Sequence, residues 1–203
     1  MFGIISRFFA SVLAPTETFR LNHIAFLVSF VEKAAAAFGK LDLFVGPAEI
    51  WDGEGTREIY IGAADCSASV LLMEPVKEGA YLRAMKKRGP GLHHIAVDVP
   101  DLESYIDGLS GSGWFLHPKS LQTIRKLKTA YPARPGIPAL IEVHEAAVTA
   151  VSPRLIERIV LNLPARAAGM IDALGLSGVV QAGGDESVYF SNSRKIGLKE
   201  FLG

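Results

Sequence analysis

The most regular alternation of apolar and polar side chains covers residues 92–99, directly after a Gly/Pro-rich loop. Isoleucine and valine fill every second position, and the positions between them hold His94, Ala96 and Asp98. A period of two is typical of a β-strand with one buried face. Pro100 ends the run, and Asp101 is suited to cap a helix over residues 102–109. The pattern therefore predicts a strand followed by a helix, with a histidine on the less apolar face.

The phrase His-Ile-Ala at the centre of this strand also occurs near the start of the chain. It lies in residues 21–28, beginning at His23, and a helical run over 31–38 follows. A weaker copy of strand and helix, without the histidine, covers 158–164 and 165–174. This repetition predicts an internal repeat. A lone strand histidine is more often a core residue than a ligand, but two histidines at matching places favour a shared role.

The chain in order reads as two strand–helix–strand–strand–strand units and a shorter third one. The expected elements are strands over 21–28, 41–45 with 49–51, 56–63, 68–74, 92–99, 114–116, 123–129, 139–143, 157–163, 178–181 and 187–190, and helices over 31–38, 80–88, 102–109 and 165–174. The expected organisation is an N-terminal apolar helix or extension (1–20), a first βαβββ unit (21–76), a connecting helix and loop (77–91), a second βαβββ unit (92–148) and a C-terminal extension with a partial third repeat (149–203).

Composition narrows the class of protein. Apolar residues make up 49% of the chain, and 21 basic residues balance 21 acidic ones, so we expect a folded core and no nucleic-acid partner. The single cysteine, Cys66, cannot form an internal disulfide, and we expect a cytoplasmic protein. No apolar run is long enough to span a membrane. The apolar segment 2–14 predicts a helix that packs on the domain or its partner, with a short targeting or interfacial helix as the alternative.

Three motifs carry a resemblance to a known family. They are GPGLHHIAVDVPDLE from Gly89, LLMEP from Leu71 and ALIEV from Ala139. Over residues 22–145 the chain resembles the glyoxalase/vicinal oxygen chelate superfamily, and within it methylmalonyl-CoA epimerase-like proteins. The resemblance implies an α+β fold in which paired βαβββ units form a curved mixed sheet of the glyoxalase type. A divalent metal is expected on its concave face.

The resemblance also implies roles for single residues. The metal ligands of the family fall on His23, His94 and Glu142, and its catalytic base falls on Glu58. The remaining ligand of the family, a glutamine or glutamate, falls on Leu71, which cannot bind a metal. Two imidazoles and one carboxylate form a three-residue facial site that suits Co, Mn, Zn, Ni or Fe.

One residue offers a replacement for the missing ligand. His144 lies two residues after Glu142, on the same strand face. It is an alternative ligand or, more simply, a solvent-facing or dimer-contact histidine.

Several functions remain open at this point. The first is a metal-dependent isomerase, epimerase or lyase acting on an acyl-CoA-like or other α-substituted carbonyl compound. The second is a non-catalytic ligand-binding module with a degenerate metal site, suggested by Leu71. The third is glyoxalase-like or dioxygenase chemistry on another substrate. We expect a small-molecule substrate, an acyl-CoA in the first case, and a homodimer.

Overall fold

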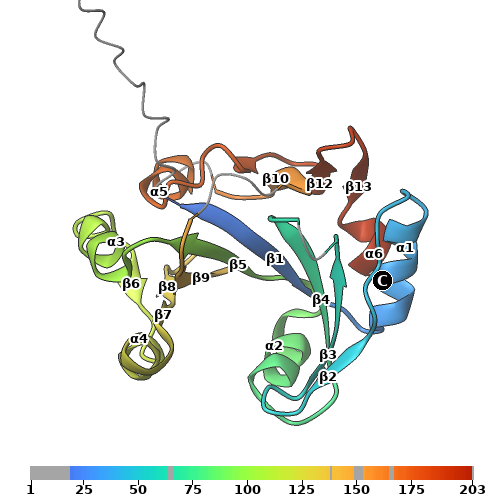
Figure 1. Ribbon diagram of the computed structural model, residues 1–203, viewed down its shortest axis with the longest axis horizontal. Helices are drawn as coiled ribbons and strands as arrows, with labels where there is room; N and C mark the ends of the chain where they lie inside the picture. The colour runs from blue at the N-terminus through green and yellow to red at the C-terminus, as the bar shows by residue number, and fades with distance from the viewer. Residues whose placement is uncertain (1–18, 64–65, 138, 149–152, 165–166, 203) are drawn as a thin grey trace, which may run out of the picture.

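The computed structural model describes residues 19–63, 66–137, 139–148, 153–164 and 167–202 (Figure 1). The N-terminal helix expected over residues 2–14 lies outside these residues. Within them, no helix has the length and apolar character needed to cross a membrane.

Most strands of the first two units form one curved, seven-stranded mixed sheet, in the order β2-β3-β4-β1-β5-β9-β7, and β6 and β8 form a separate two-stranded sheet. The first unit consists of β1 (Arg20–Leu27), α1 (Val31–Gly39), β2 (Glu49–Trp51), β3 (Thr56–Ile61) and β4 (Ser69–Pro75). After α2 (Ala80–Arg88), the second unit consists of β5 (Gly91–Val99), α3 (Leu102–Gly108), β6 (Phe115–Leu116), α4 (Ser120–Leu127), β7 (Thr129–Ala130), β8 (Pro132–Ala133) and β9 (Leu140–Glu145).

The two units repeat one pattern of strand pairing. The first strand of each unit runs parallel to its last strand, β1 to β4 and β5 to β9. The units meet where β1 pairs with β5 in the antiparallel sense. This arrangement confirms the predicted α+β fold with paired units in a curved mixed sheet.

One predicted strand of the second unit is wrong. Residues 120–127 form helix α4, although a strand was expected over 123–129. Leu121, Ile124 and Leu127 are spaced by three, and the residues between them include the straight-chain helix formers Gln122, Arg125 and Lys126. The helix ends at Lys128, whose backbone is left-handed (φ 50°). The expected strand over 41–45 is likewise absent, apart from one isolated bridge between Val45 and Ile61.

The C-terminal residues form a separate four-stranded sheet in the order β11-β10-β12-β13. Its elements are β10 (Ile156–Leu161), α5 (Ala167–Ala173), β11 (Val180–Ala182), β12 (Ser187–Phe190), β13 (Lys195–Gly197) and α6 (Lys199–Leu202). The strand–helix–strand order follows the weak third repeat. The pairing differs, because β10 runs parallel to β11, the strand directly after the helix.

This C-terminal sheet covers one face of the main sheet and shares its core. Phe201 packs edge-on against Phe26 of β1, with ring centroids 5.1 Å apart, and tilts onto Phe38 of α1 at 4.8 Å. In Figure 1 the C-terminal strands lie above β1 and β5, and α2 and α4 lie below. The face of the main sheet opposite the C-terminal strands is the concave one.

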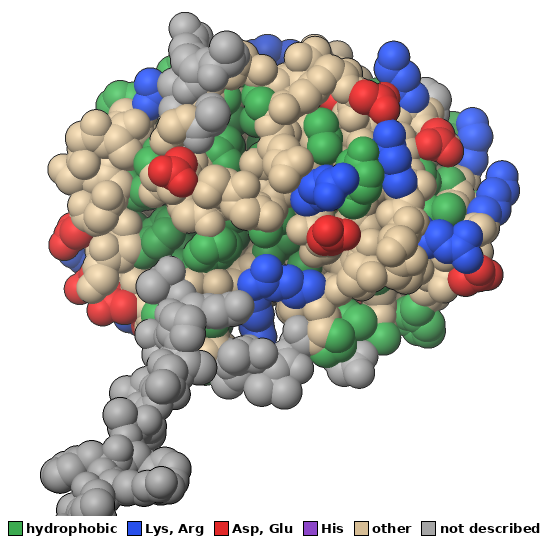
Figure 2. All heavy atoms as spheres, turned by 90° about the horizontal axis from the view of Figure 1, so that it is seen from above, with side chains coloured by type: hydrophobic (Ala, Val, Ile, Leu, Met, Phe, Trp, Pro, Cys, Tyr) green, Lys and Arg blue, Asp and Glu red, His purple; other side chains and the backbone are tan. Residues whose placement is uncertain are grey.

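The surface seen from the C-terminal side is chemically mixed. Figure 2 shows basic and acidic side chains interspersed over it, and no histidine of the described residues is visible there. The histidines of β1 and β5 face away from this surface, toward the concave side of the sheet. Any chemistry that uses them belongs to that side.

Candidate metal centre

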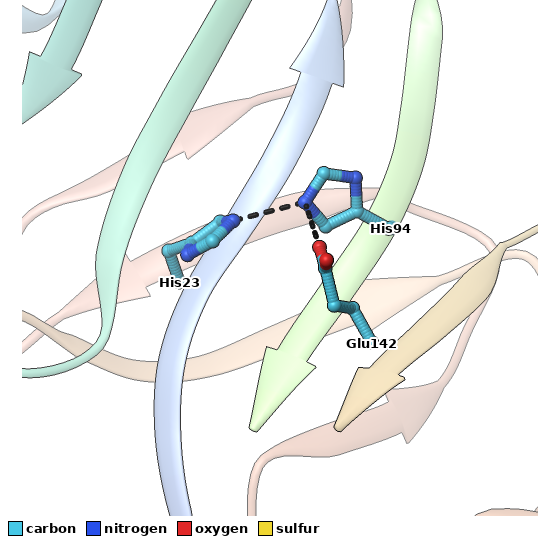
Figure 3. A group of neighbouring side chains, drawn as sticks. All are labelled: His23, His94 and Glu142. Atoms are coloured by element: carbon cyan, nitrogen blue, oxygen red, sulfur yellow. Dashed lines mark hydrogen bonds and ion pairs between the residues drawn. The ribbon is translucent and has the colours of Figure 1, made fainter. Parts of the chain in front are cut away.

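The three predicted ligands converge on the concave face. His23 comes from β1, His94 from β5 and Glu142 from β9, and Figure 3 shows one ring nitrogen of His94 facing both of the others. The Nε2 atoms of His23 and His94 are 2.9 Å apart, and Nε2 of His94 is 3.3 Å from Oε2 of Glu142. All three ligand atoms lie within 4.8 Å of one another. The prediction that these side chains share one site is consistent with this geometry.

Strand register explains why they meet. His23 pairs across the β1–β5 ladder with Ala96, and Ala96 pairs across the β5–β9 ladder with Glu142. His94 lies two residues before Ala96 and therefore on the same face of β5. Ala25, opposite His94, is as buried as Ala96, and neither side chain is large enough to fill the space between the ligands.

The group fits a divalent cation. Ligand atoms at right angles around an ion with bonds of about 2.0–2.2 Å lie roughly 3 Å apart. The separations of 2.9 Å and 3.3 Å are close to this value, and the third pair lies within 4.8 Å. Burial lowers the pKa of His23 to about 4 and the pKa of His94 well below its ordinary value. Both imidazoles are therefore neutral at neutral pH, as metal binding requires.

The carboxylate of Glu142 is held from behind. The hydroxyl of Tyr131 donates to Oε1 at 2.9 Å, which leaves Oε2 facing His94. His144 lies 3.9 Å from the same Oε1 and contacts Thr129 Oγ1 through Nδ1 at 3.2 Å. His144 thus sits behind the carboxylate, and the ligand group found in the described residues does not include it.

The fourth corner expected from the family is apolar. Leu71 pairs with Ala25 on one side and Tyr60 on the other, so it lies diagonally next to His23. Its side chain is 4% exposed and packs with Ala25, Leu27 and Met73 beneath Tyr81 of α2. This cluster leaves an apolar wall where the family has a fourth ligand.

Replacing Leu71 with glutamine should tighten metal binding. The new carboxamide oxygen adds a ligand next to His23, whereas burial of the amide in this apolar cluster lowers stability by about 1–3 kcal/mol. Cobalt titration of the wild type and of Leu71→Gln measures the first effect and thermal unfolding of the metal-free proteins the second. Leu71→Met, which stays apolar, is the matched control. Equal cobalt affinities for wild type and Leu71→Gln would place Leu71 outside the ligand corner.

Glu58 lies on the same face but outside the ligand group. It is 6% exposed on β3, and Thr56 Oγ1 donates to its Oε1 at 2.6 Å. Burial raises the pKa of Glu58 above its ordinary value, although the Thr56 hydrogen bond opposes the shift. A raised pKa makes the carboxylate a stronger base at neutral pH.

A cavity of about 370 Å³ opens beside Glu58, and none of its lining residues is a ligand histidine. Its lining includes Glu58, Tyr60 and Ser69. Ser69 pairs directly with His23 in the β1–β4 ladder, and the rings of Tyr60 and His23 meet edge to face with centroids 6.0 Å apart. A ligand in this cavity would therefore contact Glu58, with Tyr60 and Ser69 between it and His23.

Sequence reasoning missed the tyrosines and the polar neighbours of the ligands. Tyr60 has a sequence signal, because it lies two residues after Glu58 on one strand and so shares its face. Asn22 and His93 also have one, because each directly precedes a repeated histidine. Tyr81 and Tyr131 have none, since only the folded positions of α2 and of the turn after β7 bring them here.

The buried histidines predict acid sensitivity of the metal-free protein. Burial lowers the pKa of His93, like that of His23, from 6.5 to about 4. Between pH 6.5 and about 4, these histidines bind protons in the unfolded chain but not in the folded protein. The free energy of unfolding therefore falls as the pH drops through this range, and these groups do not change it above about pH 6.5. At about 1.4 kcal/mol per pKa unit, His93 alone accounts for on the order of 3 kcal/mol. Urea unfolding across this window measures the slope, and His93→Gln should flatten it; an unchanged slope would contradict the assignment.

Two units that share one pattern of strand pairing and meet at their first strands, with a His-His-Glu group on the concave face, define a candidate metalloprotein of the α+β class. A profile of the Glyoxalase/Bleomycin resistance protein/Dioxygenase superfamily matches residues 22–131, more than half of the chain. The chain therefore belongs to this superfamily. The match includes His23, Glu58 and His94 and ends before Glu142.

Solved structures share the fold. A hypothetical protein, BH1468 from Bacillus halodurans, is 23% identical with a TM-score of 0.53, over 66% of this chain and 99% of that one. Methylmalonyl-CoA epimerase from Mycobacterium tuberculosis is 24% identical with a TM-score of 0.50, over 68% of this chain and 95% of that one. At this identity the similarity shows the fold alone. No curated protein matches the chain.

Proposed function

We propose that this protein is a metal-dependent isomerase or epimerase that moves a proton on the carbon next to a carbonyl group, with an acyl-CoA-like compound as the substrate. The observation that carries the proposal is the presence of the His23, His94 and Glu142 group and of buried Glu58 on one concave face. A lyase acting on the same class of α-substituted carbonyl compound uses the same groups. The name of the Mycobacterium tuberculosis neighbour makes methylmalonyl-CoA the first substrate to test.

In this proposal, metal binding and proton transfer belong to different residues. His23, His94 and Glu142 would hold the metal, which supplies positive charge for a substrate oxygen when bound. Glu58 takes the proton from the α-carbon, and Thr56 orients its carboxylate through the 2.6 Å hydrogen bond. Burial raises the pKa of Tyr60 to about 12, so its hydroxyl remains a donor toward the substrate in the cavity. The apolar wall at Leu71 limits water at the ligand corner.

A second cavity supports an anionic substrate tail. It has a volume of about 500 Å³, with Arg88, His117 and Arg134 among its lining residues and no acidic side chain among those described. Leu140 also lines it and pairs with His94 across the β5–β9 ladder. The cavity beside Glu58, in contrast, contains the two carboxylates of Glu49 and Glu58. A substrate with a negatively charged tail is therefore favoured with its tail toward Arg88 and Arg134.

Dioxygenase chemistry is the second candidate, and Leu71 favours it. Two histidines and one carboxylate with open positions are the ligand set of non-haem Fe(II) oxygenases. An apolar fourth corner keeps the set at three ligands. Oxygen consumption by the iron-loaded protein with a panel of catechols tests this alternative.

The deciding experiment follows α-proton exchange. The protein is loaded with cobalt or manganese, incubated in D₂O with methylmalonyl-CoA and other acyl-CoA esters, and the α-proton signal is recorded by NMR. Loss of the signal supports the proposal. If the loaded protein exchanges no α-proton, the epimerase proposal fails; if it binds no metal either, a non-catalytic ligand-binding module is the better reading.

A homodimer in the cytoplasm remains our expectation. Phe44, Ile50 and Trp51 are 60%, 65% and 51% exposed and lie on or before edge strand β2. An edge strand with exposed apolar side chains is a common place for association between chains. Light scattering during size-exclusion chromatography measures the oligomeric state.

A further inference from the structure

The pairing of β1 with β5 is irregular at two places, next to each ligand histidine. In β1 the register shifts between Leu21 and His23, so Asn22 has no paired residue in β5. The second shift has Ala25 opposite His94 and the next residue, Phe26, opposite Leu92, which leaves His93 as the extra residue. Bulges of this kind re-aim side chains. Asn22 and His93 can therefore share the concave face with the histidines that follow them.

Each extra residue contacts the Nδ1 atom of the ligand histidine that follows it. Oδ1 of Asn22 lies 2.9 Å from Nδ1 of His23, and Nδ1 of His93 lies 2.9 Å from Nδ1 of His94. In each repeat the contact is on the side of the imidazole away from the metal centre, where Nε2 of His23 faces Nε2 of His94. In both units, a bulged residue thus contacts Nδ1 of the ligand histidine directly after it.

The direction of the Asn22 contact is fixed by its other partner. Nδ2 of Asn22 donates to Oδ1 of Asp98 at 2.9 Å, and a carboxylate only accepts. Arg20 holds the other oxygen of Asp98 through Nε at 3.1 Å and Nη2 at 2.5 Å. Since the amide nitrogen of Asn22 is directed to Asp98, its oxygen faces His23. His23 therefore donates from Nδ1, and its Nε2 carries the lone pair.

His93 can serve His94 in either direction. As an Nδ1–H tautomer it donates to His94, whose Nε2–H then donates to Nε2 of His23. As an Nε2–H tautomer it accepts from Nδ1–H of His94, which frees Nε2 of His94 for a cation. Both rings exchange tautomers with no change in their number of protons. His93 is 9% exposed and packs against the ring of Tyr81, with centroids 4.8 Å apart.

We propose that Asn22 and His93 are positioning residues, which sit on β-bulges and direct Nε2 of His23 and of His94 toward the metal. Asn22 fixes the tautomer of His23, whereas His93 accepts from Nδ1 of His94 when a cation is bound. Asp98 and Arg20 complete the Asn22 arm by orienting its amide. The inference rests on the metal site of the proposed function. Groups in this outer position typically change metal affinity by about 10–100-fold.

The Asn22 arm is tested by the tautomer of His23 and by metal affinity. In metal-free protein with ¹⁵N-labelled histidine, NMR should show the Nδ1–H tautomer of His23 in the wild type and its loss in Asn22→Leu. Asp98→Asn, which keeps the size but lets residue 98 donate or accept, should weaken the same preference. Cobalt affinity should fall about 10–100-fold in both variants.

The His93 arm is tested by His93→Phe, which keeps a ring against Tyr81 but removes the acceptor. Its cobalt affinity should fall over the same range, and the visible spectrum of any bound cobalt should shift. The inference would be overturned if folded Asn22→Leu bound cobalt with the affinity of the wild type and kept the Nδ1–H tautomer of His23. If the wild type binds no cobalt, the metal site of the proposed function fails; the His23 tautomer then still shows whether Asn22 orients the ring.

Discussion

Replacing His94 with glutamine is expected to abolish specific metal binding. Nε2 of His94 lies between the other two ligands, 2.9 Å from His23 and 3.3 Å from Glu142. Glutamine has nearly the reach of histidine but offers a weakly binding amide oxygen, so the two remaining ligands are left without the group that links them. The loss should exceed the roughly 10–100-fold change typical of outer-shell residues.

Thermal unfolding with and without cobalt measures this loss directly. A metal present at 100 times its Kd stabilises the folded protein by about 2.7 kcal/mol, and this shift should disappear in His94→Gln. His117→Gln is the matched control, because His117 is exposed and lies at the second cavity. Cobalt binding by His94→Gln at wild-type affinity would contradict the assignment of the metal centre.

The family resemblance assigned the ligands in the sequence, and simple strand periodicity explains why these side chains share one face. His94 and Glu142 each lie on a strand with clear alternation, and the repeat supplies His23. Alternation alone places residues i and i+2 on one face, and pairing of first strands brings the two repeats together. The convergence of these side chains therefore needed only the register of three neighbouring strands.

The bulged residues could not be predicted from the same rule. Strict alternation assigns Asn22 and His93 to the apolar face, opposite the histidines that follow them. The register shifts in the β1–β5 ladder overturn that assignment, and a register shift depends on packing between two distant strands. The outer part of the metal centre is consequently visible only in the structure.

Helix α4 and the pairing of the C-terminal strands escaped prediction for a different reason. A short run with apolar residues at every third position satisfies a helix as well as an irregular strand, as residues 120–127 show. The order strand–helix–strand also fits two kinds of pairing. In the first two units the first strand runs parallel to the last strand of its unit, whereas β10 runs parallel to β11, the strand directly after the helix. Local sequence does not distinguish these pairings, because the choice depends on which surface the strands must cover.

Glu58→Gln is expected to remove most α-proton exchange while leaving metal content unchanged. The amide keeps the size of the side chain and can still accept from Thr56, but it cannot take a proton from carbon. Loss of a positioned general base lowers the rate by about 10²–10⁴-fold. Glu58 lies outside the ligand group, so cobalt stoichiometry and affinity should match the wild type.

Glu49→Gln provides the control for this prediction. Glu49 pairs with Glu58 across the β2–β3 ladder and lines the same cavity, yet it is exposed, whereas Glu58 is 6% exposed. Its replacement removes a nearby negative charge without removing the buried base, so exchange should persist. In the wild type, exchange should decline with acidification at a pH above that expected for an ordinary glutamate, because burial raises the pKa of Glu58. Equal losses of exchange in both variants would assign the effect to the charge of the cavity and leave the base unidentified.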